Sequence, residues 1–177
     1  MLSGRSAIAL DATGVREAVA LGDALSSTPI ATILSSPRRR ARETAAAIAD
    51  RRGLAVVSEP ALDEIDFGAL AGRSFAELDG DPDWARWNGE RGSARCPGGE
   101  TMGEASARAW RMIEGLAPGI TLCVTHCDVI RALVCDVLGL GYDRMFQLGC
   151  DPASVTELAM DGGGMRVVAT NRRYGAV

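Results

Sequence analysis

The sequence lacks the features that mark several common classes of protein. No apolar run is long enough to cross a lipid bilayer. The first residues, Met1 to Arg5, lack the apolar core of a signal peptide. The formal net charge of −4 leaves no general surface for nucleic acid. We therefore expect a cytoplasmic protein that binds neither membranes nor nucleic acids.

Histidine is scarce, and the cysteines form no regular framework. His126 is the only histidine, and the five cysteines are an odd number at scattered spacings, which argues against a set of disulfides. Cys123, His126 and Cys127 are close in sequence and suggest a metal site. However, alternation along a strand would place Cys123 and His126 on opposite faces. We therefore expect no bound metal and interpret the cysteines as reduced, mostly buried thiols.

The chain does contain an alternation of short apolar strands and amphipathic helices over most of its 177 residues. The pattern predicts strands at residues 30–34, 54–58, 120–125, 154–160 and 165–169, the last two forming a hairpin. It predicts helices at residues 13–26 and 37–52, behind the capping box at 101–104, and before residue 138. This order predicts one α/β domain over residues 1–177, a three-layer α/β/α sandwich around a mixed, mostly parallel sheet.

At Ser36 the chain turns from the first predicted strand into the second predicted helix. Ser36 is a suitable N-cap, and Pro37 suits the first helical position. The run Arg38–Arg40 then has the wrong charge for a helix start, because the helix dipole favours negative groups there. A bound phosphate would resolve the conflict, since backbone N–H groups and guanidinium groups would both point at it. The alternative is a solvated basic turn.

Three groups of polar residues follow predicted strands. These are the run Arg38–Arg40, then Glu64 with Asp63 and Asp66 beside it, and finally His126. Ligands of such sheets bind at the carboxyl ends of the strands, so the agreement favours an anion site over a chance arrangement. A lone histidine is more often structural, and Glu64 alone reads as surface charge. Together, an arginine, a histidine and one of these carboxyls indicate phosphoryl chemistry without a metal. If Glu64 is the general acid, Asp63 and Asp66 are bystanders, but spacing alone does not choose among the three.

Residues 60–99 form the least regular part of the chain and contain Trp84 and Trp87. A long connection of this kind is usually functional or acts as a lid. The two tryptophans would then line a substrate pocket. They could equally cover an edge of the domain, and we favour this structural interpretation.

These motifs resemble those of the histidine phosphatase superfamily, also called phosphoglycerate mutase-like, over nearly the whole chain. The Ser-Ser-Pro-x-x-Arg-Ala-x-x-Thr-Ala element of that family is similar to residues 35–45, and its Leu-x-Glu-x-x-Phe-Gly segment to residues 62–68. The remaining matches are Pro97–Glu100, the Thr-His-x-Asp-Val-Ile-Arg element at residues 125–131, and Ser154–Thr156 in the late strand.

The resemblance implies roles for individual residues. Glu64 would be the catalytic acid and His126 the second pocket histidine, while Arg40 and His126 would hold phosphoryl oxygens. We also assign Arg5, Ser36 and Cys127 to substrate binding, although Cys127 stands where the family usually has glycine. The expected ligand is a small phosphorylated substrate or inorganic phosphate, with no metal or organic cofactor. Hydrolysis is favoured over mutase-type phosphotransfer, and small bacterial relatives include broad phosphatases and α-ribazole phosphatase.

The chain departs from the family pattern at its N-terminal end. Members begin with a strand that ends in Arg-His-Gly, whose histidine becomes phosphorylated, whereas here the match starts at Ser3–Arg5. Without that strand, neighbouring strands would have unpaired edges. Either Met1 is an internal start and the natural protein is an ordinary phosphatase, which we favour, or the chain is a non-catalytic phospholigand-binding or interaction module. An in-frame Arg-His-Gly upstream of Met1 would decide between them; a homodimer is left open.

Overall fold

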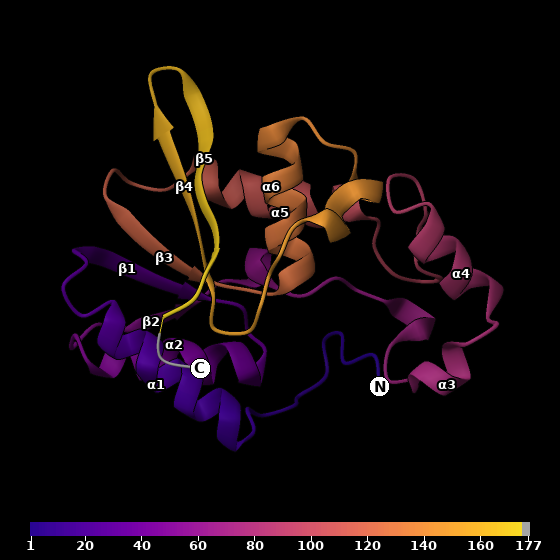
Figure 1. Ribbon diagram of the computed structural model, residues 1–177, viewed down its shortest axis with the longest axis horizontal. Coiled ribbons are helices and arrows are strands. Elements are labelled where there is room, and N and C mark those ends of the chain that lie inside the picture. The colour runs from indigo at the N-terminus through magenta and orange to yellow at the C-terminus, as the bar shows by residue number, and fades with distance from the viewer. Residues whose placement is uncertain (175–177) are drawn as a thin grey trace.

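A three-stranded parallel sheet lies at the centre of the computed structural model, which describes residues 1–174 (Figure 1). Strand β1 (Ile30–Ser35) pairs with β2 (Val56–Ser58) on one edge and with β3 (Ile120–Val124) on the other, so the order is β2-β1-β3. Ile33 is fully buried in β1, because helices cover both faces of the sheet. The α/β fold with a mainly parallel sheet, predicted from the alternation of elements, is confirmed.

Helices α1 (Ala12–Ala24) and α2 (Arg39–Asp50) pack against each other on one side of the sheet. Their apolar faces and β1 form one core cluster. Helices α5 (Met102–Glu114) and α6 (Cys127–Leu138) pack against each other on the other side (Figure 1). The capping box predicted at Thr101 and Glu104 begins α5. None of the helices in residues 1–174 is both long and apolar enough to cross a membrane.

The last two strands form the predicted antiparallel hairpin, β4 (Val155–Asp161) and β5 (Gly164–Arg172). Within residues 1–174 no strand pairs with the second edge of β3, and the hairpin is a sheet of its own that contacts α6 through β5. The sheet is therefore divided in two, whereas the sequence pattern suggested one. The side chains of β3 are only partly buried, and Ile120 is 44% exposed.

Residues 60–99 are more regular than the sequence suggests. They contain helices α3 (Phe75–Leu78) and α4 (Pro82–Gly89) and two single 3-10 turns, Pro60–Leu62 and Gly68–Leu70; a longer 3-10 helix, Tyr142–Gln147, follows α6. Trp87 is completely buried, with its ring 6.0 Å from that of Phe67 in an edge-to-face contact. The structural interpretation is thus confirmed for Trp87. Trp84 is partly buried and packs on Phe75.

Two glycines allow the Pro97–Glu100 turn to lie directly against Asp66–Gly68. A Cβ atom on Gly99 would be 2.1 Å from the Asp66 carbonyl oxygen, and one on Gly68 would be 2.1 Å from the Pro97 carbonyl oxygen. Any side chain at either position would therefore push the two segments apart. This close contact places Glu100 beside the segment that carries Glu64.

Candidate active site

Helix α2 begins later than the sequence predicts. The Ser36 N–H donates to the Val124 carbonyl at 2.9 Å, so Ser36 continues the pairing of β1 with β3. Arg38 occupies the N-cap position without a side-chain cap, and the helix starts at Arg39. The prediction that Ser36 is the N-cap residue, with Pro37 at the first helical position, is therefore wrong, although the Ser36 hydroxyl does accept from the Arg38 N–H at 3.2 Å. The sheet hydrogen bond holds Ser36 extended and leaves its hydroxyl facing the interior.

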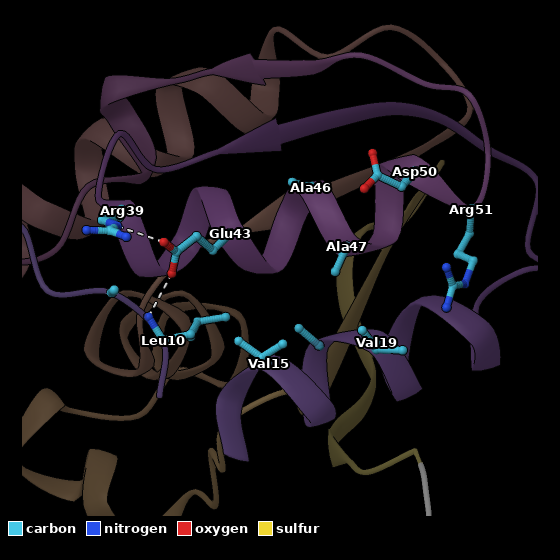
Figure 2. Close-up of a pocket in the computed structure, with 11 residues that line it drawn as sticks. Leu10, Val15, Val19, Arg39, Glu43, Ala46, Ala47, Asp50 and Arg51 are labelled. Carbon is cyan, nitrogen blue, oxygen red and sulfur yellow. Dashed lines mark hydrogen bonds and ion pairs between the residues drawn. The ribbon is translucent and has the colours of Figure 1, made fainter. Parts of the chain in front are cut away.

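The three consecutive arginines point in three directions. Arg39 is exposed, pairs with Glu43 at 2.7 Å, and faces a groove between α1 and α2 (Figure 2). Arg38 places its Nε 2.9 Å from Asp63 Oδ1. Only Arg40 reaches His126, and it also donates to the Gly4 carbonyl at 2.8 Å. The run is therefore no single basic patch, because helical geometry separates neighbouring side chains by about 100°.

The groove in Figure 2 is separate from the site that contains Arg40. It has a volume of about 530 Å³ and apolar walls formed by Val15 and Val19 of α1, Ala46 and Ala47 of α2, and Leu10 just before α1. No residue among Arg40, Glu64 and His126 lines it. It follows that the catalytic candidates gather outside this cavity.

Arg40 and His126 meet at the carboxyl ends of β1 and β3. Arg40 Nη2 lies 3.0 Å from His126 Nδ1, and His126 Nε2 lies 2.8 Å from Ser36 Oγ. A guanidinium group can only donate, so Nδ1 must accept and Nε2 must carry the proton. The Ser36 hydroxyl accepts from Nε2 and in turn donates to Asp63 Oδ1 at 3.3 Å. These contacts select the neutral tautomer of the imidazole with its proton on Nε2.

The surroundings of His126 also keep the ring neutral. The side chain is buried, and burial lowers the pKa of His126 to about 3, with further lowering by the positive charges of four arginines. These arginines are Arg40, Arg108, Arg38 and Arg5. Both the burial and the hydrogen bonds of the ring favour its neutral form. An added negative charge would be attracted to this cluster of cations.

Glu64 is the carboxyl that faces the Arg40–His126 pair. Its Oε2 lies 3.7 Å from both Arg40 Nη2 and His126 Nδ1, and its Oε1 accepts from the Ile65 N–H at 3.0 Å. Burial, followed by the negative charge of Asp128, raises the pKa of Glu64 to about 7. A substantial fraction of this carboxyl is therefore protonated near neutral pH. Such a group can donate a proton to a leaving oxygen.

Asp63 is not the bystander that the sequence suggested. Its Oδ1 accepts from the Glu64 N–H at 2.8 Å and from the Ser36 hydroxyl, and lies 2.9 Å from Arg38 Nε. The side chain thus joins the loop after β2 to the loop after β1. The sequence contained no sign of this role except that Asp63 stands next to Glu64. The partners that define the role, Ser36 and Arg38, lie elsewhere in the chain.

Arg5 lies near the site but is occupied by protein groups. Its Nε donates to the Glu64 carbonyl at 2.9 Å, its Nη1 to Asp66 at 3.1 Å and its Nη2 to Glu100 at 2.9 Å. These bonds tie the first residues of the chain to the segment that carries Glu64. Asp66 is likewise a structural partner, since its other oxygen accepts from the Gly68 N–H at 2.9 Å.

A buried ion pair that the sequence did not indicate supports the site from α6. Asp128 accepts from Arg91 Nη1 at 3.1 Å, and both side chains are buried. The Arg91 guanidinium lies between the rings of Trp87 and Phe146, 4.7 and 4.8 Å from their centroids. The position of Asp128 two residues after His126 was the only local signal. Arg91 gave none.

Cys127 lies next to His126 in the chain but makes no hydrogen bond to Arg40, Glu64 or His126. Its Sγ is 3.7 Å from Asp128 Oδ1. Cys127 is exposed at the surface, unlike the buried thiols that the sequence led us to expect. Partial desolvation of its sulfur, followed by the negative charge of Asp128, still raises the pKa of the thiol to about 12. Within residues 1–174 no three side chains of the metal-ligating types form a cluster that fits a metal ion.

The arrangement combines guanidinium groups, a neutral imidazole and a carboxyl that is partly protonated near neutral pH. Arginine guanidinium groups bind the oxygens of phosphoryl groups with charge-assisted hydrogen bonds. The carboxyl of Glu64 stands beside them with a proton to give. This set of groups suits the binding of a tetrahedral oxyanion and the protonation of an oxygen attached to it.

Comparisons with known proteins agree with this chemistry. Phosphoserine phosphatase 1 from Hydrogenobacter thermophilus is 30% identical over 158 residues, which cover 86% of this chain and 75% of that protein. The solved structure of mycobacterial glucosyl-3-phosphoglycerate phosphatase is similar with a TM-score of 0.85 and 28% identity, covering 97% of this chain and 90% of that one.

A further solved structure shows the same fold at lower identity. The α-ribazole phosphatase from Shigella flexneri has a TM-score of 0.85 and 24% identity, and the match covers 99% of this chain and 90% of that one. The family model of the histidine phosphatase superfamily (branch 1) matches residues 1–173. This chain therefore belongs to the histidine phosphatase superfamily.

Proposed function

We propose that the site binds the phosphoryl group of small phosphomonoesters and belongs to a metal-independent phosphatase. The observation that carries this proposal is the convergence of Arg40, His126 and Glu64 within 3.7 Å of one another. Arg40 and His126 hold phosphoryl oxygens, and Glu64 is the general acid. Arg5, Ser36 and Cys127 complete the surroundings of the bound group.

The reaction takes two steps when a nucleophilic histidine is present. A histidine nitrogen bonds to phosphorus while the ester P–O bond breaks, and Glu64 gives its proton to the leaving oxygen. Water then attacks phosphorus, the P–N bond breaks, and the Glu64 carboxylate takes a proton from the water. The pKa of about 7 suits both halves of this cycle, because the group can give and regain a proton near neutral pH.

The 177-residue chain by itself is proposed to bind phosphomonoesters with little or no turnover. Its one histidine, His126, uses both ring nitrogens in hydrogen bonds to Arg40 and Ser36. A ring held in this way is suited to binding an oxyanion rather than attacking phosphorus. The same observation favours a second candidate function, a non-catalytic module that binds a phosphorylated ligand.

Hydrolysis is proposed in preference to mutase-type phosphotransfer. Relatives with phosphatase names support this choice, namely phosphoserine phosphatase 1 and glucosyl-3-phosphoglycerate phosphatase. A related mycobacterial structure contains inorganic phosphate, which supports phosphate as a ligand here. The substrates of those proteins share a phosphate ester on a small polar alcohol, and this is the substrate class we propose.

The test combines turnover and binding. We expect the chain to release almost no p-nitrophenol from p-nitrophenyl phosphate and to bind vanadate, a phosphoryl mimic. Arg40→Ala should abolish vanadate binding, whereas Arg39→Ala should retain it because Arg39 faces the groove between α1 and α2. Robust turnover that is lost in His126→Ala would instead identify His126 as the nucleophile. Absence of vanadate binding to the unmodified chain would contradict the proposed site.

A further inference from the structure

Side chains, rather than a strand or helix, hold the segment that carries Glu64. This segment, residues 61–66, begins within the 3-10 turn Pro60–Leu62 and has no helix or strand after Leu62. Arg108 of α5 donates to the Ala61 carbonyl at 2.6 Å and to the Glu64 carbonyl at 3.2 Å. Thr125 donates to the Leu62 carbonyl at 2.7 Å. Arg108 therefore contacts both ends of the turn that aims the Glu64 side chain.

Arg108 is itself fixed by Glu100. Its Nε lies 3.2 Å from Glu100 Oε1, and its Nη2 lies 3.3 Å from Oε2. Glu100 Oε2 also accepts from Arg5 at 2.9 Å and from the Asp66 N–H at 3.1 Å. Since Arg5 donates to the Glu64 carbonyl, the contacts form a closed ring around the segment. The fork of a guanidinium group suits this geometry, because it serves several acceptors in one plane.

Direct contact between Arg108 and a ligand does not follow from this geometry. All three nitrogens of its guanidinium group donate to protein oxygens, and the side chain is only 14% exposed. Any effect of Arg108 on the site must therefore pass through the groups that it holds. One of the residues that Arg108 holds is Glu64, whose carboxyl lies beside Arg40 and His126.

We propose that Arg108 is a positioning residue which, held by Glu100, keeps the Glu64 carboxyl facing Arg40 and His126. The proposal rests on the proposed function only for the role of Glu64 as the acid. A lysine at position 108 would keep the positive charge but lose the planar fork, so it could not serve Ala61, Glu64 and Glu100 together. The substitution Arg108→Lys therefore separates positioning from charge.

The experiment compares Arg108→Lys with Arg111→Lys, a matched control on the exposed face of the same helix. The first readout is the Glu64 pKa from carbon-13 NMR titration of the glutamate carboxyls, assigned with Glu64→Gln. Release of the segment should lower this pKa by about one unit in Arg108→Lys, because burial is the main cause of its elevation. Vanadate affinity should fall about tenfold. Arg111→Lys should change neither.

Equal behaviour of the two lysine variants would overturn the proposal. So would lower vanadate affinity with an unchanged Glu64 pKa, since that result would place Arg108 in contact with the ligand. If Arg108→Lys does not fold, Glu100→Asp takes its place, since it keeps the negative charge but shortens the side chain that holds Arg108. It should also lower the Glu64 pKa, and no change would count against the ring. If the unmodified chain binds no vanadate, the proposed function fails, whereas the Glu64 titration still decides the positioning role.

Discussion

Burial shifts the two titratable groups of the site in opposite directions. It raises the pKa of Glu64 from its ordinary value of 4.5 to about 7 and lowers that of His126 from 6.5 to about 3. In both cases the uncharged form is favoured, because a charge is costly in a poorly solvated place. When Glu64 is protonated, Arg40 has no ionised carboxylate within 4.0 Å among the described residues, so an entering anion would supply its counter-charge.

These shifts make the free energy of unfolding depend on pH. Folded Glu64 keeps its proton between pH 4.5 and 7 while the unfolded chain releases it, so this stabilisation is complete below pH 4.5 and is lost as the pH rises to about 7. For His126 the unfolded chain takes up a proton below pH 6.5 and the folded protein does not, so stability is lost as the pH falls from 6.5 towards 3. Between pH 4.5 and 6.5 the two effects oppose each other.

Glu64→Gln should expose the contribution of the carboxyl. The free energy of unfolding of the wild-type chain, minus that of the variant, should fall by about 3 kcal/mol between pH 4.5 and pH 8. The reason is that glutamine has no proton to lose, while Glu64 must ionise in a buried place. Urea denaturation at several pH values measures this difference. A difference that stays constant over the whole range would show that Glu64 has an ordinary pKa.

Single residues also show how far sequence reasoning reached. Positions after predicted strands marked the run Arg38–Arg40, the carboxyls around Glu64, and His126. The family resemblance then singled out Arg40 and Glu64, and the structure brings these two and His126 together. The roles of Asp63 and Arg108 were missed. Their partners lie on other elements, such as Ser36 for Asp63 and Ala61 for Arg108, and no local pattern marks such contacts.

At the scale of elements, the site depends on short turns that follow strands. The first turn of α2, which follows β1, carries Arg40; the loop after β2 carries Glu64, and β3 ends just before His126. A fourth turn, Pro97–Glu100, brings Glu100 against the loop after β2. Each turn is short, so a small change in its packing should move the site residues that it carries.

Gly99→Ala should strongly destabilise the protein. The new Cβ would lie 2.1 Å from the Asp66 carbonyl oxygen, a rigid backbone atom, so the two turns would have to separate. We expect a loss of about 2 kcal/mol or more in the free energy of unfolding. Gly89→Ala at the end of α4 is the control, because nothing lies within 4 Å of its added Cβ. Thermal or urea denaturation of both variants provides the comparison, and equal stabilities would contradict the close contact.

At the scale of the whole molecule, the chain has a formal net charge of −4 but contains a local cluster of cations. The cluster comprises Arg5, Arg38, Arg40 and Arg108, all of which lower the pKa of His126. Three of these arginines are paired with carboxylates: Arg38 with Asp63, Arg5 with Asp66 and Glu100, and Arg108 with Glu100. Within residues 1–174 the only carboxyl paired with Arg40 is that of Glu64, which is partly protonated near neutral pH, so a bound anion would supply the counter-charge of Arg40. Anion binding should therefore be coupled to the stability of the entire fold.

Inorganic phosphate should raise the melting temperature of the chain. A ligand that binds only the folded state at a hundred times its dissociation constant adds about 2.7 kcal/mol to the free energy of unfolding. The effect should disappear in Arg40→Ala and persist in Arg39→Ala, as measured by thermal denaturation with and without phosphate at constant ionic strength. Equal stabilisation of both variants by phosphate would point to binding elsewhere on the surface.

The sequence by itself determined the order of the elements, the parallel pairing, the C-terminal hairpin and the groups of polar residues at strand ends, within which the family resemblance singled out Arg40 and Glu64. These depend on local periodicity, on turn residues and on the rule that strand ends share one edge of a sheet. Only the tertiary structure decided that Ser36 continues the sheet, that Arg38 to Arg40 diverge, that the sheet divides after β3, and that His126 is neutral. Such features depend on burial and on partners 86 and 90 residues away in the chain, and local sequence patterns carry no information about contacts of that range.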